Sequence, residues 1–389
     1  MQKRKLLIPL LFAFLGTCST LTAQEDLSLQ QLLDKGANAE KLGLDDRAVE
    51  YYQQALGAAN PDEGLADSLA AEPYYRLALI EERRCHNNQA AGYLRQVVAL
   101  FPQSALGYEH LAYNLIESGT YTDELHALIE QAVELNPASA SAYASMALYF
   151  NHEGNFTNAL HWAKKAVETD PKYPRAYNTM GVIYYNRGNE QDALAQFRKA
   201  LAVDPDNVDA YYNLGVMYVQ KNNFETALTH LKKGLQREPK SVKLYYYLGA
   251  AYRQKGDSQK AVQCYETIMQ IDSLYVPAYN AMGAVFASKG DYDKAVAYHQ
   301  KAANIDPQNA ESYKCLGKVN TDRGDYVKAL RAYQKAVAIN DKDHETYCLI
   351  AKLYAKQGNT SREAASYKKA AKLGNKEAQQ WMAKRGQAW

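Results

Sequence analysis

One tyrosine recurs along this chain at a nearly constant spacing, and this spacing limits the folds that the chain can adopt. Nine tyrosines form this series, and successive members lie 34 residues apart in seven of eight steps and 35 apart in the other. They are Tyr74, Tyr108, Tyr143, Tyr177, Tyr211, Tyr245, Tyr279, Tyr313 and Tyr347. A period of this length predicts a stack of similar small units, each of which buries its apolar face only against its neighbours.

Each unit carries two stripes of apolar residues that are typical of two amphipathic helices. Apolar or small residues at +0, +3, +4 and +7 from the tyrosine form the first stripe, and those at +16, +20 and +23 form the second. Turns such as Gly256-Asp257 separate the two helices, and a proline such as Pro205 ends most units. The small residues at +4 and +16 indicate a close helix crossing.

This pattern resembles the tetratricopeptide repeat (TPR), with tyrosine in place of the tryptophan that opens the repeat motif. The resemblance covers residues 29–389 and implies an all-α fold, a right-handed α-solenoid of about ten helix-turn-helix units. We expect a degenerate first unit with an insertion in residues 24–70, nine units in 71–375 and a capping helix in 376–389, where Trp381 takes the place of the next tyrosine.

The N-terminal segment has the features of an export signal. Lys3, Arg4 and Lys5 precede an apolar run from Leu6 to Leu15, which is too short to span a bilayer. We therefore expect residues 1–23 to be a signal peptide, cleaved before Gln24, and the protein to be periplasmic.

A second possible processing signal follows the apolar run, so two forms of the exported protein remain open. Leu15-Gly16-Thr17-Cys18 resembles a bacterial lipoprotein signal, in which Cys18 is lipidated and anchors the protein to the cell envelope. The membrane is expected to be a partner only in that case.

Charge is distributed unevenly along the rest of the chain. Residues 24–239 carry 18 basic and 29 acidic side chains, whereas residues 240–389 carry 24 and 14. The near-neutral total disfavours a general nucleic-acid-binding protein. The opposite charges of the two halves would orient a partner or favour self-association between copies.

The sequence contains no pattern that indicates catalysis, a metal or a cofactor. His344-Glu345 is followed by Cys348, where a zinc-peptidase motif needs a second histidine, and no glycine-rich phosphate loop is present. We therefore expect no enzyme activity and no cofactor. Helix spacing of 8 to 10 Å also predicts free thiols at Cys315 and Cys348, because a disulfide needs closer α-carbons.

The TPR resemblance implies that partners bind on the first helices, which line a concave groove. The corresponding positions here combine tyrosines, amides and a lysine, which suit an extended peptide. They include Asp209 and Tyr247, and the residues that we expect to contact the partner are Asn178, Tyr212, Asn213, Lys243, Tyr246 and Asn280. The carboxylate clamp of one TPR subclass is not expected, because only Asn213 and Lys243 match it.

Four lysines near the C-terminus form a second candidate surface. Lys314 and Lys318 are one helical turn apart, as are Lys352 and Lys356. They would hold an acidic segment of a partner, or they are an ordinary solvated basic face.

The sequence thus predicts a non-enzymatic protein–protein interaction scaffold or adaptor in the bacterial periplasm. The alternative is an envelope-anchored lipoprotein subunit of an outer-membrane or cell-wall assembly machine.

Overall fold

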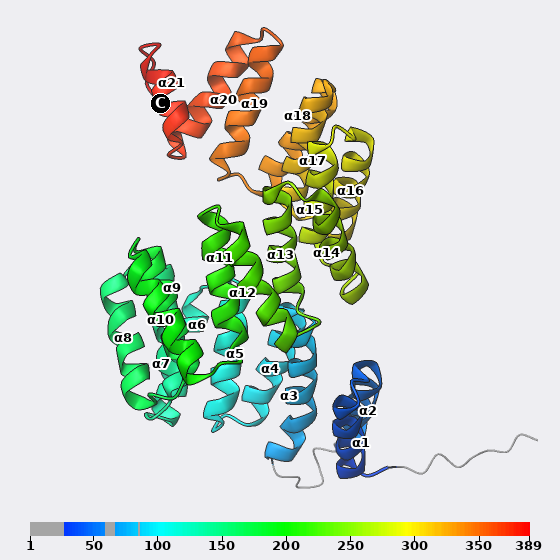
Figure 1. Ribbon diagram of the computed structural model, residues 1–389, viewed down its shortest axis with the longest axis vertical. Coiled ribbons are helices and arrows are strands. Elements are labelled where there is room, and N and C mark those ends of the chain that lie inside the picture. Colours follow the sequence, from blue (N-terminus) through cyan, green and yellow to red (C-terminus); the bar gives the residue numbers. More distant parts are fainter. Residues whose placement is uncertain (1–26, 59–66, 85) are drawn as a thin grey trace, which may run out of the picture. The chain divides into compact units, whose positions relative to one another are not determined.

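The computed structural model describes residues 27–58, 67–84 and 86–389, and every regular element in these residues is an α-helix (Figure 1). The predicted signal peptide, Cys18 and Cys85 lie outside the described residues. The chain divides into two compact units, residues 1–77 and 78–389. Each repeat supplies two consecutive helices, so the predicted all-α solenoid of helix pairs is confirmed.

The bounds of the helices follow the repeat closely. The first helices of the ten pairs are α1 (Leu29–Lys41), α3 (Asp67–Arg83), α5 (Ala105–Glu117), α7 (Ala140–His152), α9 (Pro174–Asn186), α11 (Val208–Gln220), α13 (Val242–Lys255), α15 (Val276–Ser288), α17 (Ala310–Arg323) and α19 (His344–Lys356). The second helices are α2 (Asp45–Ala58), α4 (Asn87–Leu100), α6 (Asp123–Leu135), α8 (Phe156–Thr169), α10 (Glu190–Val203), α12 (Phe224–Arg237), α14 (Ser258–Ile271), α16 (Tyr292–Ile305), α18 (Tyr326–Ile339) and α20 (Thr360–Lys372). A last helix, α21 (Lys376–Ala383), follows them.

Helices α1 and α2 form a pair of their own within residues 1–77. Ser28 caps α1 through a capping box with Gln31, which satisfies two free backbone N–H groups. Gly36 lies against the ring of Tyr52, which is fully buried, and the Tyr52 hydroxyl donates a hydrogen bond of 2.6 Å to Glu40. The expected degenerate unit therefore has the helix-pair packing of the others.

Within residues 78–389, the first helices of successive units contact one another as well as their own second helices. Contacts run from α5 to α7, α9, α11, α13, α15 and α17 in turn. The first helices consequently form a continuous layer that can present side chains from several units together (Figure 1).

The predicted close crossing of the two helices of a unit is present. A β-carbon added at Gly215 would lie 2.5 Å from the Leu231 side chain, and one at Gly249 would lie 2.6 Å from the Tyr265 ring. Such distances are well inside van der Waals contact, so only glycine fits unless the neighbouring side chain or its helix shifts.

The repeated tyrosine has a structural role that explains its spacing. The Tyr143 hydroxyl donates to the carbonyl oxygen of Pro137 at 2.7 Å, and Tyr279 donates likewise to Ser273 at 2.9 Å. Each bond connects a first helix to the loop that precedes it. A lysine 22 residues later also lies over several of these rings, for example Lys165 over Tyr143 at 4.3 Å.

The C-terminal helix covers the last repeat. Ala378 and Met382 of α21 are buried against α20, and the Trp381 ring stacks on Tyr367 with centroids 4.5 Å apart. The Arg385 guanidinium lies over the Trp381 ring, 3.8 Å from its centroid. These contacts give α21 the shielding role that was predicted for a capping helix.

Candidate functional site

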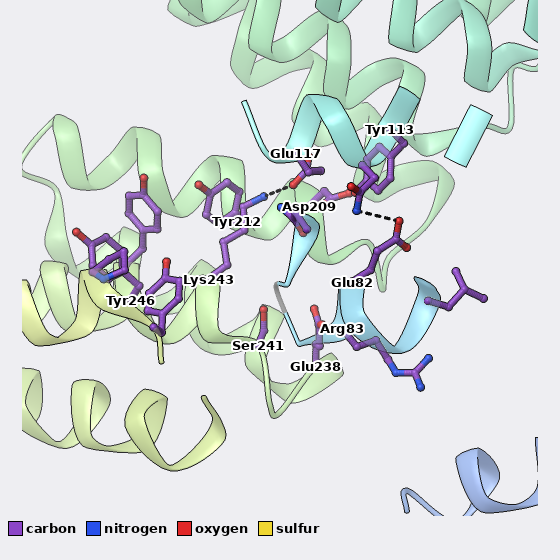
Figure 2. Close-up of a pocket in the computed structure, with 16 residues that line it drawn as sticks. Glu82, Arg83, Tyr113, Glu117, Asp209, Tyr212, Glu238, Ser241, Lys243 and Tyr246 are labelled. Carbon is purple, nitrogen blue, oxygen red and sulfur yellow. Dashed lines mark hydrogen bonds and ion pairs between the residues drawn. The ribbon is translucent and has the colours of Figure 1, made fainter. Parts of the chain in front are cut away.

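A cavity of about 740 Å³ lies among the first helices of residues 78–389 (Figure 2). This volume is in the range of known ligand pockets. Five first helices contribute to its wall, together with Asn87 of α4 and the loops before α13 and α15. Its lining residues are Leu79, Glu82, Arg83, Asn87, Tyr113, Asn114, Glu117, Asp209, Tyr212, Glu238, Ser241, Lys243, Tyr246, Tyr247, Tyr275 and Pro277.

Two contacts join parts of the protein that are distant in the sequence. Lys243 Nζ on α13 lies 3.1 Å from Glu117 Oε2 at the end of α5, although 126 positions separate them (Figure 2). His86 Nε2 lies 4.0 Å from Asp272 Oδ1, in the loop before α15. The stacking of units therefore brings α11, α13 and α15 close to α3 and α5, although several units separate them in the sequence.

A cluster of tyrosines forms one side of the wall. The Tyr212 and Tyr247 rings meet edge to face with centroids 5.2 Å apart, and Tyr246 contacts Tyr247 and Tyr275 in the same manner, at 5.4 and 6.2 Å. Burial and the neighbouring Tyr247 raise the pKa of Tyr212, so its hydroxyl stays neutral at physiological pH. The cluster presents ring surface and neutral hydroxyl groups to the cavity.

Carboxylates make up most of the charge in the wall. Glu82, Glu117, Asp209 and Glu238 are acidic, whereas Arg83 and Lys243 are basic. We call this site the acidic cavity.

The negative charges of the carboxylates in the acidic cavity are only partly balanced by nearby basic side chains. Surrounding protein atoms raise the pKa of Asp209 and of Glu82, and the negative charge of Glu117 raises both further. The pKa of Glu238 is also raised, first by burial and then by Asp209. Asp209 is nevertheless exposed to solvent. The carboxyl groups therefore favour the approach of a positive charge.

Two cationic side chains already lie on tyrosine rings at this site. Lys243 Nζ lies 4.2 Å from the Tyr212 ring centroid, and the Arg175 guanidinium lies 3.8 Å from that of Tyr113. Arg175 is on α9, beside the wall, and its charge lowers the pKa values of Glu82 and Asp209 without cancelling their upward shifts. The tyrosines of this region thus accept cations on their faces.

Asn114 adds a buried amide to the wall. Its side chain is 1% exposed, and Nδ2 donates to Glu82 Oε1 at 3.3 Å. Its Oδ1 atom accepts no hydrogen bond from the described residues. A buried acceptor without a donor is costly, so this atom favours a ligand that carries N–H groups.

The structure places the predicted groove residues in different environments. Tyr212, Lys243 and Tyr246 line the acidic cavity, whereas Asn213 is half-buried on α11 and is not among the lining residues. Their contact with a partner stays a prediction.

The two other predicted amides bond within the protein. Asn178 Nδ2 donates to Asn207 Oδ1 at 2.7 Å, and Asn280 Nδ2 donates to Ser312 Oγ at 2.9 Å. Asn207 is the N-cap of α11, and its Oδ1 also accepts from the backbone N–H of Ala210. Each amide therefore connects a first helix to the start of the next one.

The predicted C-terminal lysines are not equivalent. Lys314 lies 2.6 Å from Glu311 and close to Asp343 and Glu345, and Lys352 lies 2.9 Å from Glu377.

Lys318 and Lys356 are exposed, as is Lys352, and Lys356 Nζ lies 5.6 Å from the Tyr326 ring centroid. Lys318 is on α17. Neighbouring carboxylates thus neutralise part of this surface, and its binding of an acidic segment stays a prediction.

Several cavity residues were not predicted from the sequence. Asp209 and Tyr247 were recognised as groove positions, but Glu82, Tyr113, Asn114 and Glu117 were not. The last four belong to the second and third helix pairs. The acidic character of residues 24–239 was the available signal, yet no local pattern indicates which of its carboxylates face α11 and α13.

Other site types find little support in the described residues. They contain no group of three or more His, Cys, Asp or Glu side chains arranged to hold a metal ion. Cys264, Cys315 and Cys348 are free thiols, and burial raises the pKa of Cys348 to about 11. Of the helices that the structure describes, none combines the length and apolar content needed to cross a bilayer.

The fold and this site define a repeat α-solenoid that presents side chains from several units to one cavity. Family models for the tetratricopeptide repeat match residues 75–140, 125–174, 162–195, 181–220, 216–256, 240–308, 274–342 and 344–376. These matches extend over more than half of the chain. The chain therefore belongs to the tetratricopeptide repeat family, whose arrays generally serve as protein-interaction scaffolds and are non-catalytic.

Solved structures with the same fold share little sequence with this chain. A human IFIT1 dimer with m7Gppp-AAAA is 17% identical, with 89% of this chain and 90% of that chain covered and a TM-score of 0.55. A tetratricopeptide repeat protein from Parabacteroides merdae is 22% identical, with 63% and 97% covered and a TM-score of 0.51.

The Cut9 and Hcn1 hetero-tetramer of APC/C also has this fold. It is 15% identical, with 84% of this chain and 76% of that chain covered and a TM-score of 0.55. No curated protein sequence matches the chain. At these identities the similarity shows the fold alone.

Proposed function

We propose that this protein is a non-enzymatic interaction scaffold that holds an extended segment of a partner protein in the acidic cavity. The observation that carries the proposal is the convergence of side chains from α3, α5, α11, α13 and α15 on one cavity. Tyrosine rings supply apolar surface at low entropic cost, and amides and carboxylates supply hydrogen bonds to a peptide.

The place of action that we propose is the bacterial periplasm or cell envelope. The basic start and short apolar run of residues 1–23 support export. A soluble adaptor would begin at Gln24, whereas an envelope-anchored subunit of an assembly machine would begin at a lipidated Cys18. Intact-mass measurement of the mature protein from its host distinguishes these two forms.

Site-specific photo-crosslinking in cells tests the proposed binding site. A benzophenone amino acid replaces Tyr246, which lines the cavity, or Gln300, an exposed residue on α16 that serves as control. We expect a specific adduct from position 246 and little or none from position 300. Equal yields from both positions, or no adduct from position 246, would contradict binding in the cavity.

A charge-reversal variant tests the second predicted surface separately. Lys314, Lys318, Lys352 and Lys356 are changed to glutamate together, and the adduct at position 246 is measured again. If an acidic segment of the partner lies at this end, the adduct decreases while the helical circular dichroism is unchanged. An unchanged adduct assigns these lysines to a solvated face.

A further inference from the structure

We infer that the acidic cavity receives an arginine side chain of the bound segment; this inference rests on the proposed function. The first reason is the charge of the wall, where four carboxylates oppose two basic side chains. One of these basic groups, Lys243, is already paired with Glu117 at 3.1 Å. The remaining carboxylates, Glu82, Asp209 and Glu238, lie on separate elements around the same cavity (Figure 2).

The second reason is the unpartnered acceptor of Asn114. This side chain is 1% exposed, and its Oδ1 atom accepts no hydrogen bond from the described residues. A carboxylate or phosphate ligand has no N–H group to donate to this oxygen. An arginine has five.

The third reason is the way in which this region already holds cations. Arg175 lies over Tyr113 at 3.8 Å and Lys243 over Tyr212 at 4.2 Å, so both examples combine a tyrosine face with a nearby carboxylate. Tyr246, Tyr247 and Tyr275 provide further ring surface in the same wall. A guanidinium is planar and weakly hydrated, which makes it better suited than an ammonium to stacking on such rings.

A metal ion does not fit this arrangement. The carboxylates come from α3, α5, α11 and the loop before α13, and the described residues form no cluster of metal-ligand geometry. An organic cation with several diverging donors can reach acceptors on different helices, whereas a divalent ion needs them within about 2.6 Å.

Binding of defined peptides to the purified protein tests the inference. The probes are end-blocked pentapeptides, four alanines around a central arginine, citrulline, lysine or glutamate, and ligand-observed NMR gives their dissociation constants. Citrulline has the shape of arginine without its charge. We expect the arginine peptide to bind about tenfold or more tightly than the citrulline peptide, because charged hydrogen bonds are lost with the charge.

Two variants connect binding to the cavity. Asp209→Asn and Glu82→Gln each remove one negative charge, and the glutamine keeps an oxygen for the Asn114 amide. Asp206→Asn is the matched control, because Asp206 is exposed, lies three residues away and pairs with Arg237 at 2.8 Å outside the cavity wall. We expect about tenfold weaker binding of the arginine peptide by either cavity variant and unchanged binding by Asp206→Asn.

Three results with peptides that bind would overturn the inference. They are equal binding of the citrulline and arginine peptides, tighter binding of the glutamate peptide, and unchanged binding by both cavity variants when circular dichroism shows that they are folded. Absence of binding by all four peptides would overturn it too. The photo-crosslink at position 246 does not depend on arginine, so its failure would count against the proposed function instead.

Discussion

Lys243 Nζ on α13 lies 3.1 Å from Glu117 Oε2 at the end of α5, which connects two helices that are four repeats apart. Both side chains remain partly exposed, at 41% for Lys243 and 38% for Glu117. An ion pair in contact with water contributes little to folding. Because both residues line the acidic cavity, this ion pair has more bearing on the proposed binding than on stability.

We predict that Lys243→Gln changes the free energy of unfolding by about 1 kcal/mol or less. A double-mutant cycle with Glu117→Gln, measured by urea denaturation, gives the coupling energy directly. A coupling energy above about 2 kcal/mol would show that this contact holds the repeat array together, contrary to the prediction.

The close helix crossings predict opposite effects for two glycine substitutions. Gly249→Ala places a β-carbon 2.6 Å from the Tyr265 ring and should cost about 1–3 kcal/mol by overpacking. Gly92→Ala in α4 meets no atom within 4 Å and should be neutral or stabilise by up to about 1 kcal/mol, because alanine favours helix. Urea denaturation of the two variants checks this, and equal effects would contradict the crossing.

His299 is predicted to make the array sensitive to acid. It is 3% exposed, occupies the place of Tyr265 and Tyr333 in its own unit, and burial lowers its pKa to about 4. The unfolded state therefore binds more protons below the ordinary pKa of histidine, so stability falls as the pH decreases from about 6.5 toward 4.

The variant His299→Tyr removes this titration. Between pH 7 and pH 5 we expect the wild type to lose about 2 kcal/mol more stability than His299→Tyr, as measured by urea denaturation. The other titrating groups are shared by both proteins, so the difference isolates His299. The same loss in both proteins would contradict a lowered pKa.

The bond between Asn178 and Asn207 predicts a large effect for one N-cap. Asn207→Ala removes the acceptor for the Ala210 backbone N–H and leaves the buried amide of Asn178 without its partner. We expect a cost of about 2–4 kcal/mol, since a lost cap and an unpaired buried donor add.

A cap without such a partner provides the comparison for this variant. Asn158 donates its backbone N–H to Asn155, and no second side chain is seen on that cap within the described residues. Asn155→Ala should cost only about 1 kcal/mol. Equal losses of stability for the two cap variants, measured by thermal denaturation, would show that the Asn178 bond contributes nothing.

The fold could be predicted from the sequence because the residues that pack the two helices of a unit recur at the same positions in most units. The tyrosine spacing predicted the helix pairs, and the glycines at +4 predicted crossings that Gly215 and Leu231 show. The amides were harder to interpret. Asn178 and Asn280 occupy groove positions, but their hydrogen bonds to Asn207 and Ser312 connect neighbouring units, a pairing 29 and 32 residues away that composition does not reveal.

The amino-acid sequence by itself determined the repeat, the helix pairs within it and the charge of each half, because each unit is stabilised by contacts within one or two periods. Only the tertiary structure decided that Glu117 and Asn114 share a cavity with Asp209 and Lys243. Their meeting depends on small rotations between successive units that accumulate over four repeats. The sequence of any single unit does not specify this accumulated rotation, so the acidic cavity became visible only in the folded array.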